Sequence, residues 1–173
     1  LGDREINEFV DFGTGSGRML ELFGPRATKA VGFDLNAEML ALARMRLEEL
    51  SLTNCQVRLG DVRLLPLKSA SADLIIIHQL LHFLDDPAAA ISEAARILAP
   101  NGLLMVVDFA PHEIETLREN HEHRRLGFSK DEILRIFDEV DIMSHDYVHL
   151  DKRGTKLSPS NSLTVTIWSG VKS

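Results

Sequence analysis

The chain has 173 residues, a length that suits one globular domain, residues 1–173, built around a single hydrophobic core. Its formal net charge is −7 and its isoelectric point is about 5.5, a balance that disfavours binding to nucleic-acid phosphates. No apolar run reaches the roughly 20 residues of a membrane-spanning helix, and the single cysteine, Cys55, excludes an internal disulfide and favours a cytoplasmic location.

In the first third of the chain, short apolar runs that predict strands alternate with segments of helical spacing. The predicted strands are Glu8–Phe12, Ala30–Phe33 and Gln56–Leu59. One helix is expected to begin at Arg18. A second follows Asn36, whose side chain suits a helix cap, and it carries apolar residues at helical spacing: Leu40, Ala43, Leu47 and Leu50.

The middle of the chain holds its most hydrophobic run, Leu74–Ile77, which predicts a central strand buried on both faces. Asp86 followed by Pro87 predicts the start of a helix, with a capping carboxylate and then proline at the first helical position. That helix would bury Ile91, Ala94, Ala95 and Leu98 on one face. Residues 100–102 (Pro-Asn-Gly) are expected to stop it, and Leu103–Phe109 is the fifth predicted strand.

The last third begins with Ser129 and Glu132, which predict a capping box at the start of another helix. Two extended runs follow, Ile142–Leu150 and Leu163–Trp168, joined by a loop, Asp151–Asn161, that we expect to be mobile. Because no helix lies between these two runs, they should pair antiparallel at one edge of a sheet.

Alternation of five strands with helices predicts a parallel sheet covered on both faces. With the two late strands, the expected fold is α/β, a Rossmann-like three-layer sandwich whose mostly parallel seven-stranded sheet has an antiparallel last strand. In such sheets the ligand lies beyond the carboxyl ends of the strands, where the strand order reverses. Those ends are residues 11–17, 34–35, 60–62, 78–82 and 108–112.

The first strand ends in glycines at positions 13, 15 and 17, which let a backbone approach a ligand closely. The dinucleotide pattern G-x-G-x-x-G fails from either starting glycine, because its last position falls on Arg18 or Leu20. A dinucleotide or nucleotide-sugar enzyme is therefore disfavoured, although a plain tight turn remains an alternative for this segment alone.

Acidic residues end the next two strands. Asp34 ends the second strand, where a carboxylate can accept hydrogen bonds from both ribose hydroxyls, and helix capping is the alternative. Asp61 follows Gly60 after the third strand and could accept from the amino group of a purine beside the Val62 amide, unless it only shapes a turn. The three strand ends together favour an adenosine site more strongly than any one alone.

The successive motifs resemble those of class I S-adenosylmethionine-dependent methyltransferases, and the ubiquinone/menaquinone-biosynthesis-like type 11 branch is the most similar. The resemblance covers roughly residues 9–109 and rests on the glycine segment that begins at Asp11, on Asp34, Gly60-Asp61 and residues 65–67, 73–78 and 98–102. It implies a cofactor site for S-adenosyl-L-methionine and its product S-adenosyl-L-homocysteine, made by Asp11, Gly13, Thr14, Gly15, Gly17, Asp34, Leu35, Met39, Gly60, Asp61, Val62 and His78.

Within that implied site the parts of the cofactor are divided among the motifs. The glycine segment would contact the methionine part, and Asp34 would hold the ribose. Leu35 and Met39 would line the adenine and ribose pocket, Asp61 and Val62 would recognise the adenine edge, and the backbone at His78 would face the amino group.

A narrower resemblance involves residues 77–87, 108–112 and 121–128. These segments look like those of methyltransferase domains fused to arsenic-repressor-type winged-helix regulators. The chain shows no winged-helix segment, and it begins almost at the first strand, without the helices that usually roof the acceptor pocket. It is therefore expected to be a piece of a longer protein. A domain that senses the cofactor and controls transcription is the alternative to a catalyst.

Seven histidines raise the question of a metal, but neither close pair resembles a zinc site. His78 more naturally ends a strand than shares a helix with His82, and His121 and His123 would diverge on a helix. We expect no metal site. His82 and His112, which follow strand ends, are the candidate catalytic bases for methyl transfer to a protonated nucleophile.

The acid charge balance and the absence of a basic face predict a small-molecule methyl acceptor, with neither nucleic acid nor membrane as a direct partner. The basic cluster around Arg124 and Arg125 is interpreted as a solvated helix face. The sequence leaves the acceptor and the oligomeric state open, with a homodimer as one alternative.

Overall fold

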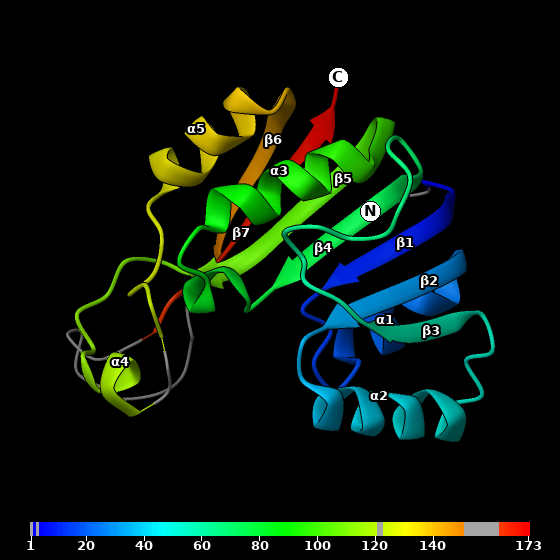
Figure 1. Cartoon of the computed structure of the whole chain (residues 1–173). Helices are drawn as coiled ribbons and strands as arrows, with labels where there is room; N and C mark the ends of the chain where they lie inside the picture. The colour runs from blue at the N-terminus through cyan, green and yellow to red at the C-terminus, as the bar shows by residue number, and fades with distance from the viewer. Residues whose placement is uncertain (1, 3, 121–122, 151–162) are drawn as a thin grey trace.

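The computed structural model describes residues 2, 4–120, 123–150 and 163–173. The predicted loop Asp151–Asn161 and the candidate metal ligand His121 lie outside the described residues. Helices follow the first, second and fourth strands as expected, but the predicted alternation is wrong between the third and fourth strands, which residues 60–71 join without a helix (Figure 1).

The sheet has seven strands in the order β3-β2-β1-β4-β5-β7-β6. Their bounds are β1 Ile6–Phe12, β2 Ala27–Asp34, β3 Cys55–Leu59, β4 Ala72–His78, β5 Leu98–Phe109, β6 Ile142–Leu150 and β7 Val165–Lys172. The pairs among the first five strands are parallel, and β7 runs antiparallel to both β5 and β6. The predicted Rossmann-like architecture with an antiparallel last strand is confirmed.

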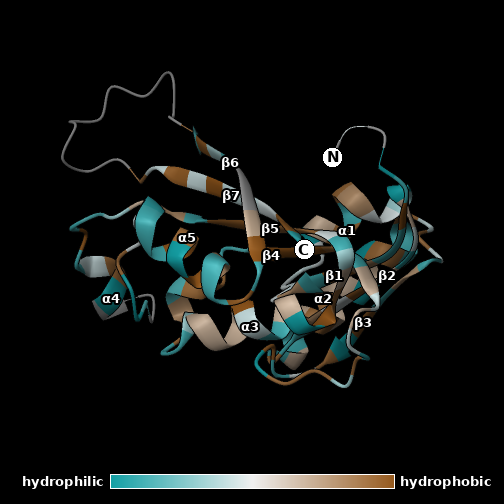
Figure 2. Cartoon of the chain, turned by 90° about the horizontal axis from the view of Figure 1, so that it is seen from above, coloured by the Kyte–Doolittle hydropathy of each residue, from teal (hydrophilic) through white to brown (hydrophobic). Residues whose placement is uncertain are grey.

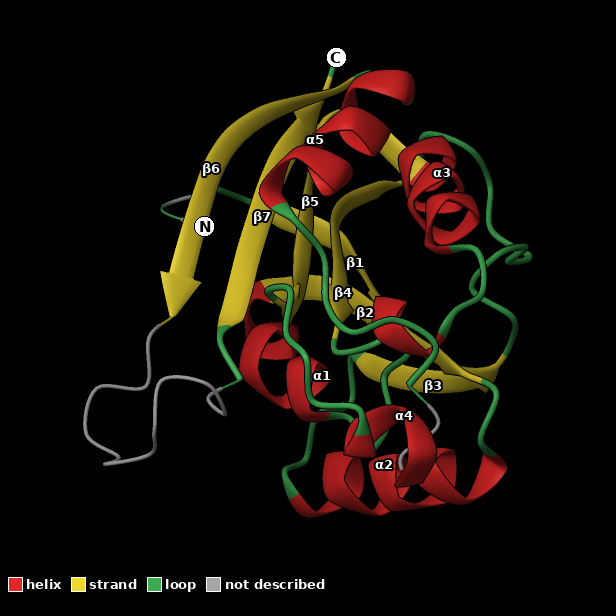
Figure 3. Cartoon of the chain, turned by 90° about the vertical axis from the view of Figure 1, so that its left-hand side faces the viewer, coloured by secondary structure: helices red, strands yellow, loops and turns green. Residues whose placement is uncertain are grey.

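Helices cover both faces of this sheet. The helices are α1 Arg18–Phe23, α2 Ala37–Glu49, α3 Pro87–Ile97, α4 Thr116–Asn120 and α5 Lys130–Glu139, with 3-10 turns η1 Gly24–Arg26 and η2 Leu81–Phe83. Figures 1 and 3 show α1 and α2 on one face and α3 and α5 on the other, while α4 stands beyond the carboxyl ends of the strands. The structure is therefore a three-layer sandwich with one open end.

Strand β4 joins the two halves of the core. Leu74 and Ile76 pack with α1 and α2, whereas Ile75 and Ile77 pack with α3 and α5. All four side chains are almost completely buried, as predicted for a central strand covered on both faces. Figure 2 shows the corresponding apolar stretches along β4 and β5 in the middle of the sheet.

The predicted helix caps form. The Asn36 side chain accepts hydrogen bonds from the Glu38 and Met39 amides at the start of α2, and the Asp86 carboxylate accepts from the Ala89 amide at the start of α3. Ser129 accepts from the Glu132 amide of α5, but the Glu132 carboxylate pairs with Arg125. The predicted first turns of these three helices are therefore correct. The capping box of Ser129 and Glu132 is only half formed, because the Glu132 side chain does not return to the Ser129 amide.

Two predictions for the apolar helix faces and ends are wrong. Helix α3 ends at Ile97, and the Pro100–Gly102 segment, predicted to stop it, lies inside β5. Strand pairing explains this, because Ala72 opposes Leu98 while Leu74 opposes Leu103, so the extra residues form a bulge with Asn101 at φ 64°. Leu50, expected among the buried residues of α2, is the residue after its end and is half exposed.

The edge of the sheet at β3 holds the single cysteine. Cys55 is buried, and its sulfur lies so close to Gly24 of η1 that a β-carbon on that glycine would be only 2.4 Å away. Burial raises the pKa of the Cys55 thiol above its ordinary value. The thiol therefore fills a packing position between β3 and η1.

Candidate functional site

A cleft of about 1180 Å³ opens at the carboxyl ends of the strands, where the chain order turns in opposite directions from β1 to β2 and from β1 to β4. Ten predicted cofactor residues line it: Gly13, Thr14, Gly15, Asp34, Leu35, Met39, Gly60, Asp61, Val62 and His78. Four other predicted residues do not line it: Asp11, Gly17, His82 and His112. Distant strand ends thus meet at the predicted edge.

The glycine segment forms the floor of this cleft through its backbone. Gly13 and Gly15 have φ values of 69° and 51°, a region that side chains rarely adopt. A β-carbon on Gly13 would lie 2.7 Å from Leu80, so the turn is also closely packed. Gly17, with φ 82°, is the N-cap residue of α1, and a β-carbon on it would lie 3.2 Å from the Ala43 side chain of α2.

Asp34 is held by two backbone amides. One carboxylate oxygen accepts from the Gly15 amide at 2.8 Å, and the other accepts from the Asn36 amide at 2.9 Å. An ionised carboxylate offers about four lone-pair positions, so each oxygen keeps one for a ligand in the cleft. This arrangement suits a vicinal diol such as that of a ribose.

Asp11 lies at the end of β1 but beneath the cleft. Its carboxyl is 1% exposed, and neither oxygen has a hydrogen-bond partner among the described residues. Burial raises the pKa of Asp11 to about 7; the nearby Thr14 hydroxyl, although outside hydrogen-bonding geometry, reduces this effect, and the charge of Asp34 increases it. A buried carboxylate without a partner favours a cationic ligand nearby, because an opposite charge would stabilise its ionised form.

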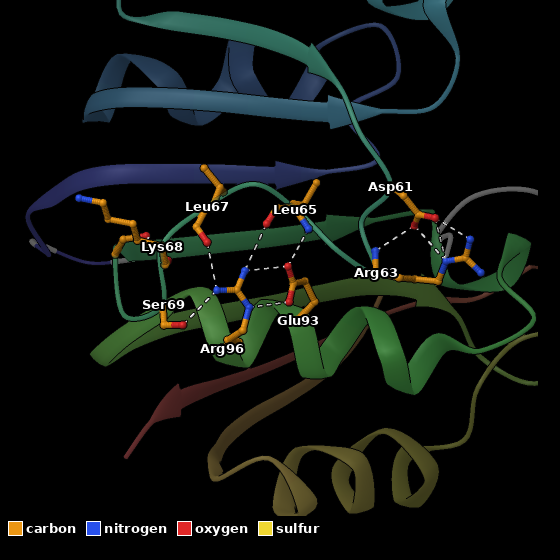
Figure 4. A network of polar contacts seen from close by, with 9 residues as sticks. Asp61, Arg63, Leu65, Leu67, Lys68, Ser69, Glu93 and Arg96 are labelled. Atoms are coloured by element: carbon orange, nitrogen blue, oxygen red, sulfur yellow. Dashed lines mark hydrogen bonds and ion pairs between the residues drawn. The ribbon is translucent and has the colours of Figure 1, made fainter.

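Asp61 and Arg63 both line the cleft and form an ion pair. The Arg63 guanidinium donates to both carboxylate oxygens, with distances of 2.9 Å from Nε to Oδ1 and 2.6 Å from Nη2 to Oδ2 (Figure 4). The Arg63 amide donates to Oδ1 as well. These hydrogen bonds hold the pKa of Asp61 below its ordinary value, so the group is an ionised acceptor.

Two residues that line the cleft, one after β1 and one after β4, carry unsatisfied polar groups. The side-chain nitrogen of Gln79 and the hydroxyl of Thr14 line the cleft, are buried and have no hydrogen-bond partner in the described part of the chain. His78 is half-buried, and burial lowers its pKa. By contrast, the apolar Leu35 is 66% exposed. Unsatisfied polar groups beside exposed apolar surface suit a ligand that has both characters, such as an adenosine with an amino-acid tail.

His82 forms a buried pair with Asp108. The Nδ1 atom of His82 lies 2.7 Å from a carboxylate oxygen of Asp108, and the two side chains are 2% and 0% exposed. The His82 ring contacts the rings of Phe83 and His123, each with a centroid separation of 4.2 Å. Phe83 lines the first cleft, whereas the buried His82 does not.

His112 lies on the same side of the molecule. Its Nδ1 accepts from the Ile114 amide, its Nε2 is buried without a partner among the described residues, and its ring meets Phe109 edge to face. Burial and the neighbouring His82 lower the pKa of His112. A second cleft of about 460 Å³ is lined by Phe83, Arg118, His123 and Arg124. Phe83 therefore belongs to both clefts.

No group of three histidine, cysteine, aspartate or glutamate side chains within residues 2, 4–120, 123–150 and 163–173 is arranged to hold a metal ion. In the same residues, no helix is long and apolar enough to cross a membrane.

Sequence reasoning missed half of the lining residues. They are Ser16, Arg18, Asn36, Ala37, Glu38, Arg63, Gln79, Leu80, Phe83 and Leu84. Most lie within a few residues of a predicted strand end, so counting further along each turn would have included them. The pairing of His82 with Asp108 was not predicted, although both residues lie in predicted strand-end segments, 78–82 and 108–112, that meet at this edge.

Comparison with known proteins gives a consistent family. The model of a methyltransferase domain matches residues 10–106, more than half of the chain. The chain is 29% identical over 123 residues to an uncharacterized methyltransferase, YcgJ, of Bacillus subtilis strain 168, a match that covers 70% of this chain. The chain spans about half of that relative, since the match covers 49% of its length.

Solved structures share the fold at low sequence identity. A putative methyltransferase from Bacillus halodurans C-125 superposes with a TM-score of 0.83 at 18% identity, covering 98% of this chain and 94% of that chain. Geranyl diphosphate C-methyltransferase from Streptomyces coelicolor A3(2), solved with Mg²⁺, geranyl diphosphate and S-adenosyl-L-homocysteine, gives 0.79 at 15% identity, covering 96% and 73%.

Proposed function

The chain belongs to the methyltransferase domain family, the class I S-adenosylmethionine-dependent methyltransferases, and we propose that it transfers a methyl group to a small-molecule acceptor. The observation that carries this proposal is the convergence of the glycine segment, Asp34 and Asp61 on one cleft. When bound there, S-adenosyl-L-methionine supplies the reactive methyl group, and the protein supplies binding and orientation.

The proposed cofactor contacts follow the lining of the cleft. The backbone of Gly13–Gly15 would hold the methionine part, with Asp11 beneath it as the counter-charge for the amino group and the His78 backbone at its side. The two free acceptor positions of Asp34 would take the ribose hydroxyls. Leu35 and Met39 would cover the adenosine, and Asp61 and Val62 would recognise the adenine edge.

We place the acceptor on the Phe83 side, where the second cleft begins. If the nucleophile starts protonated, His82 is the proposed base. Donation of the Nδ1 proton to Asp108 leaves Nε2 as the proton acceptor, so Asp108 would set the tautomer. His112, with a partnerless Nε2, is the alternative base.

The proposal also places residues 1–173 in one domain of a cytoplasmic protein, in keeping with its single cysteine. The narrower resemblance to regulator-fused domains gains no support from the relatives named above. We propose catalysis over cofactor sensing because the family model that matches is that of a methyltransferase domain.

Calorimetric titration with S-adenosyl-L-homocysteine tests the cofactor site. We expect micromolar or tighter binding by the wild type and a loss of about tenfold or more in Asp34→Asn, which removes a charged acceptor for the ribose. The matched control is Asp138→Asn, which changes an exposed carboxylate on α5. This variant should bind S-adenosyl-L-homocysteine as tightly as the wild type does. Absence of heat and of a thermal shift at millimolar ligand would contradict the proposal.

A further inference from the structure

The segment that carries Asp61 is anchored from α3 by an ion pair, and this anchor has no role in the contacts described so far. We propose that Glu93 and Arg96 are positioning residues that set the preference of the site for a 6-amino purine, because they fix the segment Gly60–Ser69. This inference rests on the proposed function, in which Asp61 recognises the adenine edge.

Glu93 ties the backbone of the segment to the helix. Its side chain is only 7% exposed, and its Oε1 atom accepts from the Leu65 amide at 2.7 Å (Figure 4). Arg96 holds the same carboxylate with two nitrogens, at 2.7 Å from Nε to Oε2 and 2.8 Å from Nη2 to Oε1. The carboxylate is therefore fixed on α3 while it holds the segment.

Arg96 then reaches three further points of the segment. Its guanidinium donates to the Leu65 carbonyl at 3.3 Å, to the Leu67 carbonyl at 3.0 Å and to the Ser69 hydroxyl at 3.0 Å. The planar fork of arginine makes this possible, since its five N–H groups point in fixed directions. A lysine could keep the charge beside Glu93 but could not make all of these contacts at once.

The segment needs such an anchor because it has little structure of its own. Residues 60–71 include no helix or strand, and Leu64, between Arg63 and the anchored Leu65, is 79% exposed. Val62 and Leu65 are buried, so the backbone on both sides of Leu64 is held against the core. Asp61 lies four residues before Leu65, whose amide donates to Glu93. The Asp61 carboxylate is therefore one helical turn's length of chain away from the anchored backbone.

The orientation of the Asp61 carboxylate matters because Arg63 already occupies most of its hydrogen-bond acceptor positions. The Arg63 side chain contributes two N–H donors and its backbone one, against about four lone-pair positions on an ionised carboxylate. The remaining position must point at the exocyclic amino group for a hydrogen bond to form. A 6-oxo purine offers no donor there, so comparing the two ligands reports on this contact.

The experiment measures the dissociation constants of S-adenosylhomocysteine and S-inosylhomocysteine by calorimetry on the full-length protein. We expect the wild type to prefer the adenosyl ligand by about tenfold or more, as for a hydrogen bond to a charged group. In Arg96→Lys and in the volume-matched Glu93→Gln, the preference should fall to about threefold or less. Binding of S-inosylhomocysteine should change little in both variants.

Two controls separate positioning from general stability. Arg135→Lys changes an exposed arginine on α5 that lines neither cleft, and Ile133→Val removes one methylene group from the buried core at α5. Both should keep the wild-type preference, including when Ile133→Val lowers the melting temperature. Because each preference compares two ligands on one protein, a smaller folded fraction cancels.

Three results would overturn the inference. In one, Arg96→Lys and Glu93→Gln both keep the wild-type preference for the adenosyl ligand, even if they bind both ligands more weakly. The contacts of Glu93 and Arg96 would then only stabilise the fold. A wild type that binds both ligands equally would remove the role of Asp61 but leave the cofactor site intact. A wild type that binds neither would refute the proposed function as well.

Discussion

Substitution of Asp11 by asparagine tests whether the buried carboxyl at the end of β1 opposes folding near neutral pH. Burial raises the pKa of Asp11 from 3.8 to about 7. The folded chain therefore binds this proton more tightly than the unfolded chain does. The contribution of Asp11 to stability is complete below its ordinary pKa, declines as the pH rises toward 7, and is unfavourable above it.

The size of the effect follows from the two pKa values. At about 1.36 kcal/mol per pH unit, the interval from 3.8 to about 7 corresponds to about 4 kcal/mol in the free energy of unfolding. Asparagine has nearly the same shape and is uncharged throughout. We expect the stability of Asp11→Asn relative to the wild type to rise by up to about 4 kcal/mol across this interval.

Urea unfolding of the cofactor-free protein between about pH 4 and pH 8 measures the difference over nearly the whole interval. Asp138→Asn, which changes an exposed carboxylate of α5, should show no comparable pH dependence. If the wild type and Asp11→Asn differ by the same free energy at every pH, Asp11 is not an isolated buried acid and the reasoning fails.

Three further predictions concern local geometry. In Asp108→Asn, nitrogen-15 NMR should show that neutral His82 no longer favours the Nδ1-protonated tautomer, whereas persistence of that tautomer would contradict the role given to Asp108. Gly17→Ala should lower the urea-derived stability by about 1–2 kcal/mol, because φ is 82° and Ala43 lies close; no loss would refute this strain. Asn36→Ala should cost about 1 kcal/mol in the same assay through the lost cap, and an unchanged midpoint would show that the cap is dispensable.

Local chemistry explains which parts of the fold could be predicted. The caps at Asn36 and Asp86 involve amides two or three residues away, so their residue types determine the hydrogen bonds. Strand β4 was equally clear, since a β-branched apolar run permits few other structures. The position of Pro100 was misjudged because a bulge depends on the pairing with Ala72, which is not visible in the local sequence.

The candidate site likewise has parts that local sequence predicts and parts that depend on tertiary packing. The turns at Gly13, Asp34 and Asp61 were found because each follows a strand end, and parallel strands bring those ends together. The hydrogen bond from Leu65 to Glu93 spans 28 positions, and nothing near either residue indicates the other. Such contacts depend on how α3 docks on the sheet, so only the three-dimensional structure reveals them.

The buried thiol of Cys55 gives the protein an intrinsic reporter group. Thiol reagents attack the thiolate, and a raised pKa and burial both suppress that form in the folded state. The rate of labelling in the folded state therefore measures how often the Cys55 sulfur, at the β3 edge of the sheet, becomes accessible. Because the chain has no other cysteine, this measurement needs no engineered label.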